Sequence, residues 1–174
     1  YDRIRQKILP VVDYDAESFD LDFQHRFSWL DRHDLTWGAN YRLYHNTFFD
    51  TDIINFNPRT RTNQLFSGFI RDEISLIPDY LRFSIGTRLD HNDFSGLEVQ
   101  PNARLMWTPD ADNSVWMAVS RAVRTPSRAE HDIRINSAQI RDFPGLSILP
   151  FPLLAVIQGS HGFNSEKLIA NQLG

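Results

Sequence analysis

Residues 81–127 alternate between apolar and polar side chains with a period of two. Over residues 81–90 one set of positions holds Leu81, Phe83, Ile85, Thr87 and Leu89, and the other holds two arginines, a serine, a glycine and an aspartate. The same alternation returns over residues 99–108 and 115–120. Successive side chains of a β-strand point to opposite faces, so the pattern predicts strands. Because the intervening segments DHNDFSG and TPDADNS are rich in turn-forming residues, we expect an antiparallel meander.

These expected strands are long, and their second face is polar throughout. They run about nine to twelve residues, whereas strands of soluble proteins usually have about five or six. About nine to eleven residues at a tilt of about 45° cross a bilayer. Arginine, asparagine, glutamine and serine on one face suit the wet interior of a barrel whose other face meets lipid. The sequence therefore predicts an all-β chain that is part of a transmembrane β-barrel.

The rest of the chain extends this pattern to about six full strands plus partial ones. Full strands are also expected at residues 19–29, 35–45 and 65–76, and partial strands at residues 1–6 and 165–174. Short turns are predicted at 30–34, 77–80 and 108–114, and loops at 7–18, 46–63, 91–97 and 121–164. Short and longer connections thus alternate, which is typical of outer-membrane barrels, and 46–63 and 121–164 are the long outer loops. Trp29, Trp37, Tyr80 and Trp107 gather near the short turns, as aromatic residues do at membrane interfaces.

Composition excludes several other classes of protein. Mean hydropathy is −0.39, and the longest apolar run, LSILPFPLLAVI, is broken by Pro150 and Pro152, so no helical membrane span is expected. There is no cysteine and hence no disulfide framework. A net charge of −4 argues against a nucleic-acid surface.

The residues suggest no catalytic or metal site. The GxSxG, HExxH, P-loop and GxGxxG motifs are missing, and the six histidines are scattered. The pair Asp50 and Asp52 is interpreted as part of a solvated loop rather than a cation site. Two alternatives stay open on the residues alone: a soluble all-β binding domain, and a membrane-barrel enzyme with a Ser–His pair that converges in space.

Several motifs resemble the barrel region of TonB-dependent outer-membrane receptors, in particular siderophore receptors. They are FQHRFSWLDRHDLTWGANYR, FSIGTRLDHN, WTPD, VSRAVRTPS and SEKLIANQLG, and they follow one another in the expected order. The last motif departs from the family at Gln172, where a glutamate is expected. This resemblance implies a β-barrel fragment over residues 1–174 without a plug domain, located in the bacterial outer membrane. Because the chain opens in what looks like a strand end, without a signal peptide, we expect it to be part of a longer precursor.

The resemblance implies active uptake of a bulky, scarce ligand such as a ferric siderophore, haem or cobalamin, and no enzyme activity. Expected partners are the rest of the barrel with its plug, the TonB complex, outer-membrane lipid and a small-molecule metal chelate; no cofactor and no nucleic acid are expected. Unpaired strand edges also predict self-association of an isolated fragment. Forked guanidinium groups suit the oxygens of a chelate. The candidate ligand-binding residues are Arg82, Arg88, Arg104, Arg124, Arg128 and His131.

Overall fold

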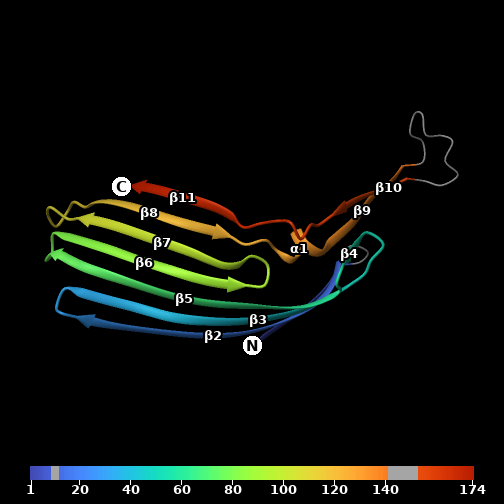
Figure 1. Cartoon of the computed structure of the whole chain (residues 1–174), viewed down its shortest axis with the longest axis horizontal. Helices are drawn as coiled ribbons and strands as arrows, with labels where there is room; N and C mark the ends of the chain where they lie inside the picture. Colours follow the sequence, from blue (N-terminus) through green and yellow to red (C-terminus); the bar gives the residue numbers. More distant parts are fainter. Residues whose placement is uncertain (9–11, 141–152) are drawn as a thin grey trace. The chain divides into compact units, whose positions relative to one another are not determined.

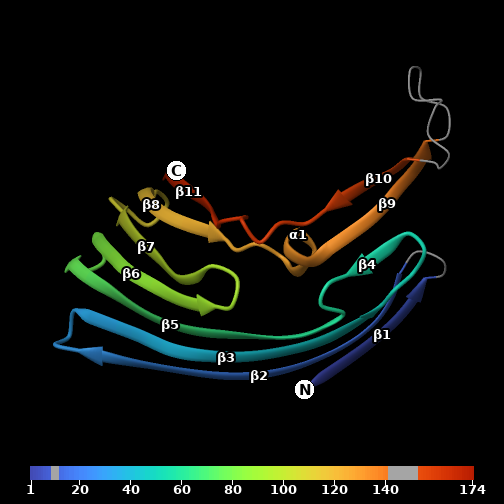
Figure 2. The ribbon, with the colours of Figure 1, turned by 45° about the vertical axis from the view of Figure 1, so that its right-hand side comes forward.

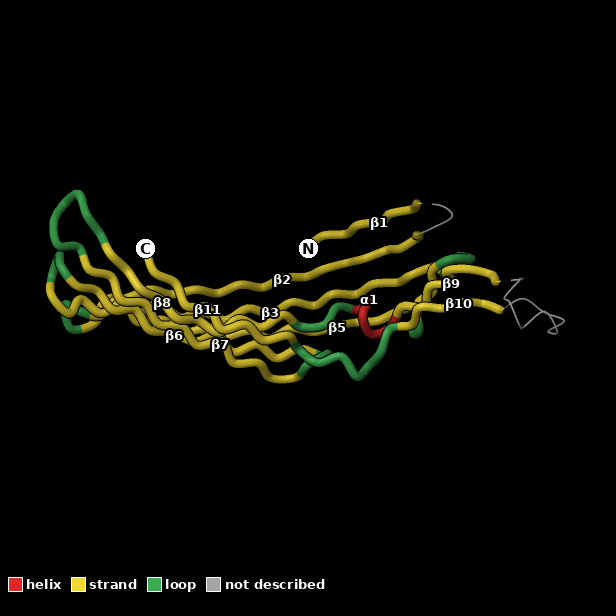
Figure 3. The backbone as a smooth tube through the Cα atoms, turned by 90° about the horizontal axis from the view of Figure 1, so that it is seen from above, coloured by secondary structure: helices red, strands yellow, loops and turns green. Residues whose placement is uncertain are grey.

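The computed structural model describes residues 1–8, 12–140 and 153–174, and the chain divides into two units. Unit 1 comprises Tyr1–Phe19, Tyr44–Asn63 and Pro126–Phe163, and unit 2 comprises Asp20–Leu43, Gln64–Thr125 and Asn164–Gly174. Strands dominate the described chain, which contains one short helix (Figure 3). The elements are β1 (Asp2–Ile8), β2 (Val12–Trp29), β3 (His33–Phe49), β4 (Ile54–Phe56), β5 (Thr60–Ile77), β6 (Leu81–Asn92), β7 (Gly96–Trp107), β8 (Val115–Arg124), α1 (Arg128–Asp132), β9 (Ile133–Ile140), β10 (Leu153–Gln158) and β11 (Glu166–Leu173).

The main sheet is a meander with strand order β1-β2-β3-β5-β6-β7-β8-β11. Within unit 2, β5 to β8 and β11 lie side by side (Figure 1), and their printed pairings are antiparallel. The register sets Ile70 opposite Thr87 and Ile85 opposite Ala103, so the apolar positions of neighbouring strands share one face. We call this the apolar face. The opposite face, which carries Arg82, Arg88, Arg104 and Arg124, is called the polar face. The all-β meander predicted from the alternation is confirmed.

Unit 1 is built from extended hairpins and a second, smaller sheet. β1 pairs with the first part of β2, and β9 pairs with both β10 and β4 in a three-stranded sheet (Figure 2). Between β8 and β9 the chain forms α1, whose N-cap is Ser127. Ser127 Oγ accepts a hydrogen bond from Glu130 N, and Ser127 N donates one to Glu130 Oε2 at 2.7 Å. This reciprocal pair is a capping box, which satisfies two backbone donors that a helix start otherwise leaves open.

The strands extend further than the alternation predicted, at the expense of the loops. Residues 12–18 lie in β2 rather than in a loop, because β1 pairs with them. The predicted loop 46–63 contains the end of β3, all of β4 and the start of β5. The predicted loop 121–164 contains the end of β8, α1, β9 and β10, and its apolar run falls largely on residues 141–152, outside the described residues. Backbone pairing continues where the side chains no longer alternate by polarity. The strands predicted from the alternation were therefore too short at their ends.

The described residues bury almost no apolar side chain. Ala16 and Phe56 are the buried hydrophobic residues, whereas Phe66 is 50% and Leu97 64% exposed, among many other large apolar side chains. A soluble sandwich covers one face of each sheet with another layer. A continuous exposed apolar face instead indicates contact with lipid or with another protein. In the described part of the chain no helix is long and apolar enough to span a membrane.

Candidate functional site

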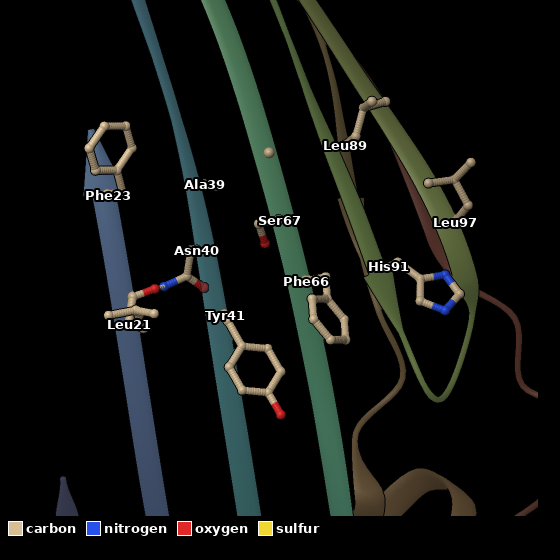
Figure 4. A pocket seen from close by; sticks show the side chains of 11 residues that line it. Leu21, Phe23, Ala39, Asn40, Tyr41, Phe66, Ser67, Leu89, His91 and Leu97 are labelled. Atoms are coloured by element: carbon tan, nitrogen blue, oxygen red, sulfur yellow. Dashed lines mark hydrogen bonds between the residues drawn. The ribbon is translucent and has the colours of Figure 1, made fainter. Parts of the chain in front are cut away.

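The apolar face of unit 2 contains a shallow recess of about 450 Å³. Figure 4 shows the side chains around it, with the ring of Tyr41 beside that of Phe66. The centroids of these two rings lie 4.7 Å apart. Ala39 and Gly68 form the floor because their side chains are small, and the walls are aromatic or aliphatic. The recess is apolar enough to hold an acyl chain, but it has few polar groups that could recognise a polar ligand.

The polar face carries arginines that already have acidic partners. Arg88 Nε donates to Asp90 Oδ1 at 2.8 Å, and its Nη2 donates to Ser67 Oγ at 2.9 Å. Arg82 lies 3.6 Å from a carboxylate oxygen of Glu73. Arg124 lies 3.6 Å from a carboxylate oxygen of Glu166 across the β8–β11 pair. These three predicted ligand-binding residues therefore form ion pairs on the polar face, Arg88 within β6 and the other two with a neighbouring strand.

Arg104 differs from the other predicted arginines of this face. Its side chain is exposed, and its guanidinium carbon lies 4.6 Å from the centroid of the Trp116 ring, a cation–π distance. Among the described residues it has no ion-pair partner. Of the predicted residues on the polar face, Arg104 is the one whose hydrogen-bond donors remain available.

The two remaining predicted residues, Arg128 and His131, lie buried in unit 1. The Arg128 guanidinium donates to the carbonyl oxygens of Asn46 at 3.1 Å and Arg59 at 2.7 Å, and it also contacts the carbonyl of Pro58. It lies 5.0 Å from the Phe48 ring centroid. Burial lowers the pKa of Arg128 from its ordinary value, and the nearby carboxylate opposes that effect. These contacts tie α1 to the ends of β3 and β5.

Asp132 is the carboxylate at the centre of this buried cluster. Its side chain is fully buried, and both of its oxygens accept from Arg61 Nη1, at 3.0 and 2.9 Å. Arg128 Nε lies 3.4 Å away, and His161 Nε2 lies 3.2 Å away. The rings of His131 and His161 stack with centroids 5.4 Å apart. We call Arg61, Arg128, Asp132 and His161 the Asp132 cluster. Arg128 is four residues from Asp132, but Arg61 and His161 are 71 and 29 residues away in sequence, which no local motif indicates.

A polar recess of about 450 Å³ opens beside the Asp132 cluster. Arg134, Gln158, Ser160, His161 and Asn57 are among the residues that line it. The Arg134 side chain is exposed, and no hydrogen bond or ion pair joins its guanidinium to the described residues. Arg134 also lines a second polar recess, with Asn136 and Asn55. We call the first of these the Arg134 recess, and its donors suit an anionic, oxygen-rich ligand.

One contact between polar side chains on the apolar face was missed by the sequence reasoning. Asp72 falls at an apolar-face position of β5, and its Oδ2 lies 2.7 Å from His33 Nδ1. His33 begins β3, directly after a short turn, and its ring lies 6.0 Å from that of Trp29. The charge of Asp72 at an apolar position of the alternation was the signal available in the sequence, and it did not identify His33 as the partner. No group of three or more potential metal ligands lies within residues 1–8, 12–140 and 153–174.

Long two-faced strands, one exposed apolar face and an ion-paired polar face define the wall of a transmembrane β-barrel. The chain belongs to the TonB-dependent receptor family, because the family model described as TonB dependent receptor-like, beta-barrel matches residues 3–134. Members of this family are transporters, not enzymes. No curated protein sequence matches the chain.

Solved structures of siderophore receptors share the fold. PirA from Pseudomonas aeruginosa superposes with a TM-score of 0.70 at 15% identity, over 93% of this chain and 29% of that one. A glycine-to-valine mutant of the ferric enterobactin receptor PfeA, also from P. aeruginosa, gives 0.70 and 15%, over 92% and 24%. PirA from Acinetobacter baumannii gives 0.65 and 14%, over 94% and 24%. The chain thus spans less than a third of each receptor, and at these identities the likeness concerns the fold alone.

Proposed function

We propose that this chain supplies part of the barrel wall and outer loops of a receptor in the bacterial outer membrane. The complete receptor takes up a bulky, scarce ligand, with a ferric siderophore as the first candidate and haem or cobalamin as further ones. The observation that carries the proposal is the family match over residues 3–134, on a sheet with one apolar and one polar face. Three structurally similar proteins are receptors for siderophores or for ferric enterobactin, which supports the choice of ligand class.

Each part of the chain has a role in this proposal. The apolar face lies against lipid, and the polar face borders the barrel interior, which holds a plug domain. The outer strands of the main sheet, β1 and β11, pair with further strands of the complete barrel. Uptake draws on the TonB complex through the complete receptor. Unit 1, which gathers most of the longer connections, captures the ligand.

Within unit 1 the Arg134 recess is the proposed ligand contact. Arg82, Arg88 and Arg124 already hold carboxylates, and Arg128 and His131 are buried. Arg134 combines exposure, unused donors and a place in two polar recesses. A guanidinium can donate two parallel hydrogen bonds to carboxylate or catecholate oxygens, which gives both affinity and orientation.

Deleting the gene that encodes this chain is expected to abolish growth on one class of iron source. Cells would be starved of iron and supplied in turn with catecholate chelates, hydroxamate chelates and haem, and separately tested for cobalamin uptake. We expect loss of accumulation of one labelled ligand, restored by the full-length gene on a plasmid. Unchanged uptake of every ligand in the deletion strain would contradict the proposed function.

Replacing Arg134 with alanine in the full-length receptor is expected to weaken binding of that ligand about tenfold or more. A charge-assisted bidentate hydrogen bond contributes about 1.5–3 kcal/mol, and about 1.4 kcal/mol corresponds to a factor of ten. The dissociation constant would be measured on purified receptor in detergent. Arg3→Ala is the matched control, because Arg3 is also an exposed arginine of unit 1 but is paired with Asp15. Equal affinity of both variants and the parent would exclude Arg134 as a ligand contact.

A further inference from the structure

One carboxylate lies on the apolar face of unit 2. Asp72 of β5 lies at an apolar-face position, directly opposite Ile85 of β6, and its side chain is 21% exposed. Among the described strand residues of unit 2 it is the one aspartate or glutamate on this face. A carboxylate that faces lipid is costly unless hydrogen-bond donors or cations compensate it. Contact with hydrocarbon alone therefore does not account for Asp72.

The partners that this chain provides for Asp72 are incomplete. Oδ2 lies 2.7 Å from His33 Nδ1, whereas Oδ1 has no hydrogen-bond partner among the described residues. Arg121, the arginine of the same face, lies on β8, three strands away, which is about 14 Å at about 4.8 Å per strand. It is also 3.7 Å from Glu98. A carboxylate can accept about four hydrogen bonds, and χ2 of aspartate is a soft torsion, so Asp72 can accept from a donor outside this chain.

Asp72 also lines an apolar groove of about 670 Å³ in unit 2. The groove crosses β5, β6, β7 and β8, which lie side by side (Figure 1). Gly86 and Ala103 leave this space open because their side chains are absent or short, and Ile70 and Val119 are among the aliphatic residues beside them. The volume is within the range of about 300–1,000 Å³ that holds small ligands. An apolar groove with a carboxylate near one end suits an amphiphile with a hydrocarbon chain and a cationic head.

The contact between His33 and Asp72 lies beside a short turn. His33 is the first residue of β3 and follows the turn after β2. Its ring centroid lies 6.0 Å from that of Trp29, the last residue of β2, which is 56% exposed. Exposed tryptophans of membrane proteins gather at the level of the lipid headgroups. The carboxylate is therefore close to the headgroup level, and the groove leads from it along the apolar face.

We infer that Asp72 binds the headgroup of a phospholipid that carries a primary ammonium group, with one acyl chain of this lipid in the groove. A primary ammonium has three donors and a positive charge, which match a carboxylate that only accepts. A trimethylammonium headgroup has the same charge but no donor, so it cannot form this hydrogen bond. The inference uses the membrane location of the proposed receptor, but neither its transported ligand nor the TonB complex.

The experiment titrates the full-length receptor, purified in detergent, with phospholipids that have identical acyl chains, and native mass spectrometry measures the bound lipid. At the tightest site, phosphatidylethanolamine is expected to bind about tenfold more tightly than phosphatidylcholine, a factor that about 1.4 kcal/mol of binding free energy provides. Equal affinity of these two lipids would overturn the inference. Tighter binding of the anionic phosphatidylglycerol would overturn it as well, because that headgroup has no ammonium.

Variants of the receptor assign the preference to this site. Asp72→Asn is expected to abolish the preference for phosphatidylethanolamine, because an amide keeps the shape of the carboxylate but not its charge. The matched control is Asp112→Asn, which removes a carboxylate from the exposed short turn after β7 and should keep the preference. Ala103→Phe places a large ring in the groove and should weaken binding of both lipids. A preference that survives in Asp72→Asn, or unchanged binding in Ala103→Phe, would contradict the inference.

The same spectra test a different occupant of the groove. A dimer of the parent receptor that Asp72→Asn separates would assign the groove to a second copy of the receptor and overturn the lipid site. Because the titration contains no transported ligand, failed uptake of every iron chelate would reject the proposed function without changing the lipid result.

Discussion

Replacing Asp132 with alanine is expected to loosen α1 and β9 without unfolding the strands of unit 2. The carboxylate is fully buried and is contacted by Arg61, Arg128 and His161. Removing one member of a buried ion pair typically costs about 3–5 kcal/mol, because the remaining charge stays buried without compensation. Amide hydrogen exchange of α1 and β9, measured on the full-length receptor in detergent, should then accelerate by about a hundredfold or more, since each 1.4 kcal/mol is about a factor of ten.

An exposed ion pair of the same unit provides the control for this prediction. Asp15 pairs with Arg3 at 2.7 Å, but the Arg3 side chain is 56% exposed. Asp15→Ala should therefore leave exchange in residues 126–140 unchanged, because exposed pairs contribute little to stability. Asp132→Asn should fall between the parent and Asp132→Ala, since an amide keeps the shape and one acceptor but not the charge. Equal exchange in all variants would mean that the Asp132 cluster does not hold this segment.

Replacing Gly38 with valine is expected to reduce the amount of folded receptor in the outer membrane severely. Gly38 is buried in β3, and a Cβ atom there would lie 2.5 Å from the carbonyl oxygen of Phe23 and 2.6 Å from the ring of Phe69. Real Cβ atoms essentially never approach other atoms so closely, so the backbone of the β2–β3 pair or the Phe69 ring must shift. Overpacking of this kind costs about 1–3 kcal/mol, and valine adds two further methyl groups. Urea unfolding of the purified receptor, followed by heat-dependent gel migration, measures the loss.

Gly68 in β5 is a matched control for the Gly38 variant. A Cβ atom at Gly68 would meet one neighbour, the Gly38 carbonyl oxygen, at an ordinary contact distance of 3.9 Å. Gly68→Ala is therefore expected to fold as the parent does, and Gly38→Ala should be the weaker form of Gly38→Val. If Gly38→Val and Gly68→Ala had the same unfolding midpoint, the close approach at Gly38 would not limit stability.

Much of the architecture could be predicted from local sequence, because strand faces depend on neighbouring residues. The alternation from Leu81 onward identified both faces of β6, and the turn-forming segments located the short connections. The strand ends were harder to predict. Residues 12–18 hold Asp13, Asp15 and Glu17 and look like a solvated loop, yet β1 pairs with them and supplies Arg3 and Lys7 as ion-pair partners. The capping box of Ser127 and Glu130 was a local signal that the interpretation of 121–164 as a loop overlooked.

The candidate site was less predictable because identical side chains have different surroundings. Arg104 and Arg128 are an example. The residues next to each of them in the sequence do not predict that one side chain is exposed and the other buried. Arg128 donates hydrogen bonds to the carbonyl oxygens of Asn46 and Arg59, which lie 82 and 69 residues away. The guanidinium of Arg104, in contrast, contacts the Trp116 ring and has no ion-pair partner among the residues that the structure describes. Arg134 has no distinguishing local signal either, and only the folded chain shows that its side chain has no partner among the described residues, which makes it the proposed ligand contact.

The sequence by itself determined that the chain forms long two-faced strands joined by short and longer connections. The alternation of apolar and polar side chains that defines the two faces depends only on residues within one strand. The tertiary structure decided which charged groups are already neutralised and which stay available. Strand register brings Glu166 opposite Arg124 and leaves only Ser84 and Ala118 opposite Arg104. Register depends on pairing between segments distant in sequence, so the pairing of these arginines could be read only from the folded sheet.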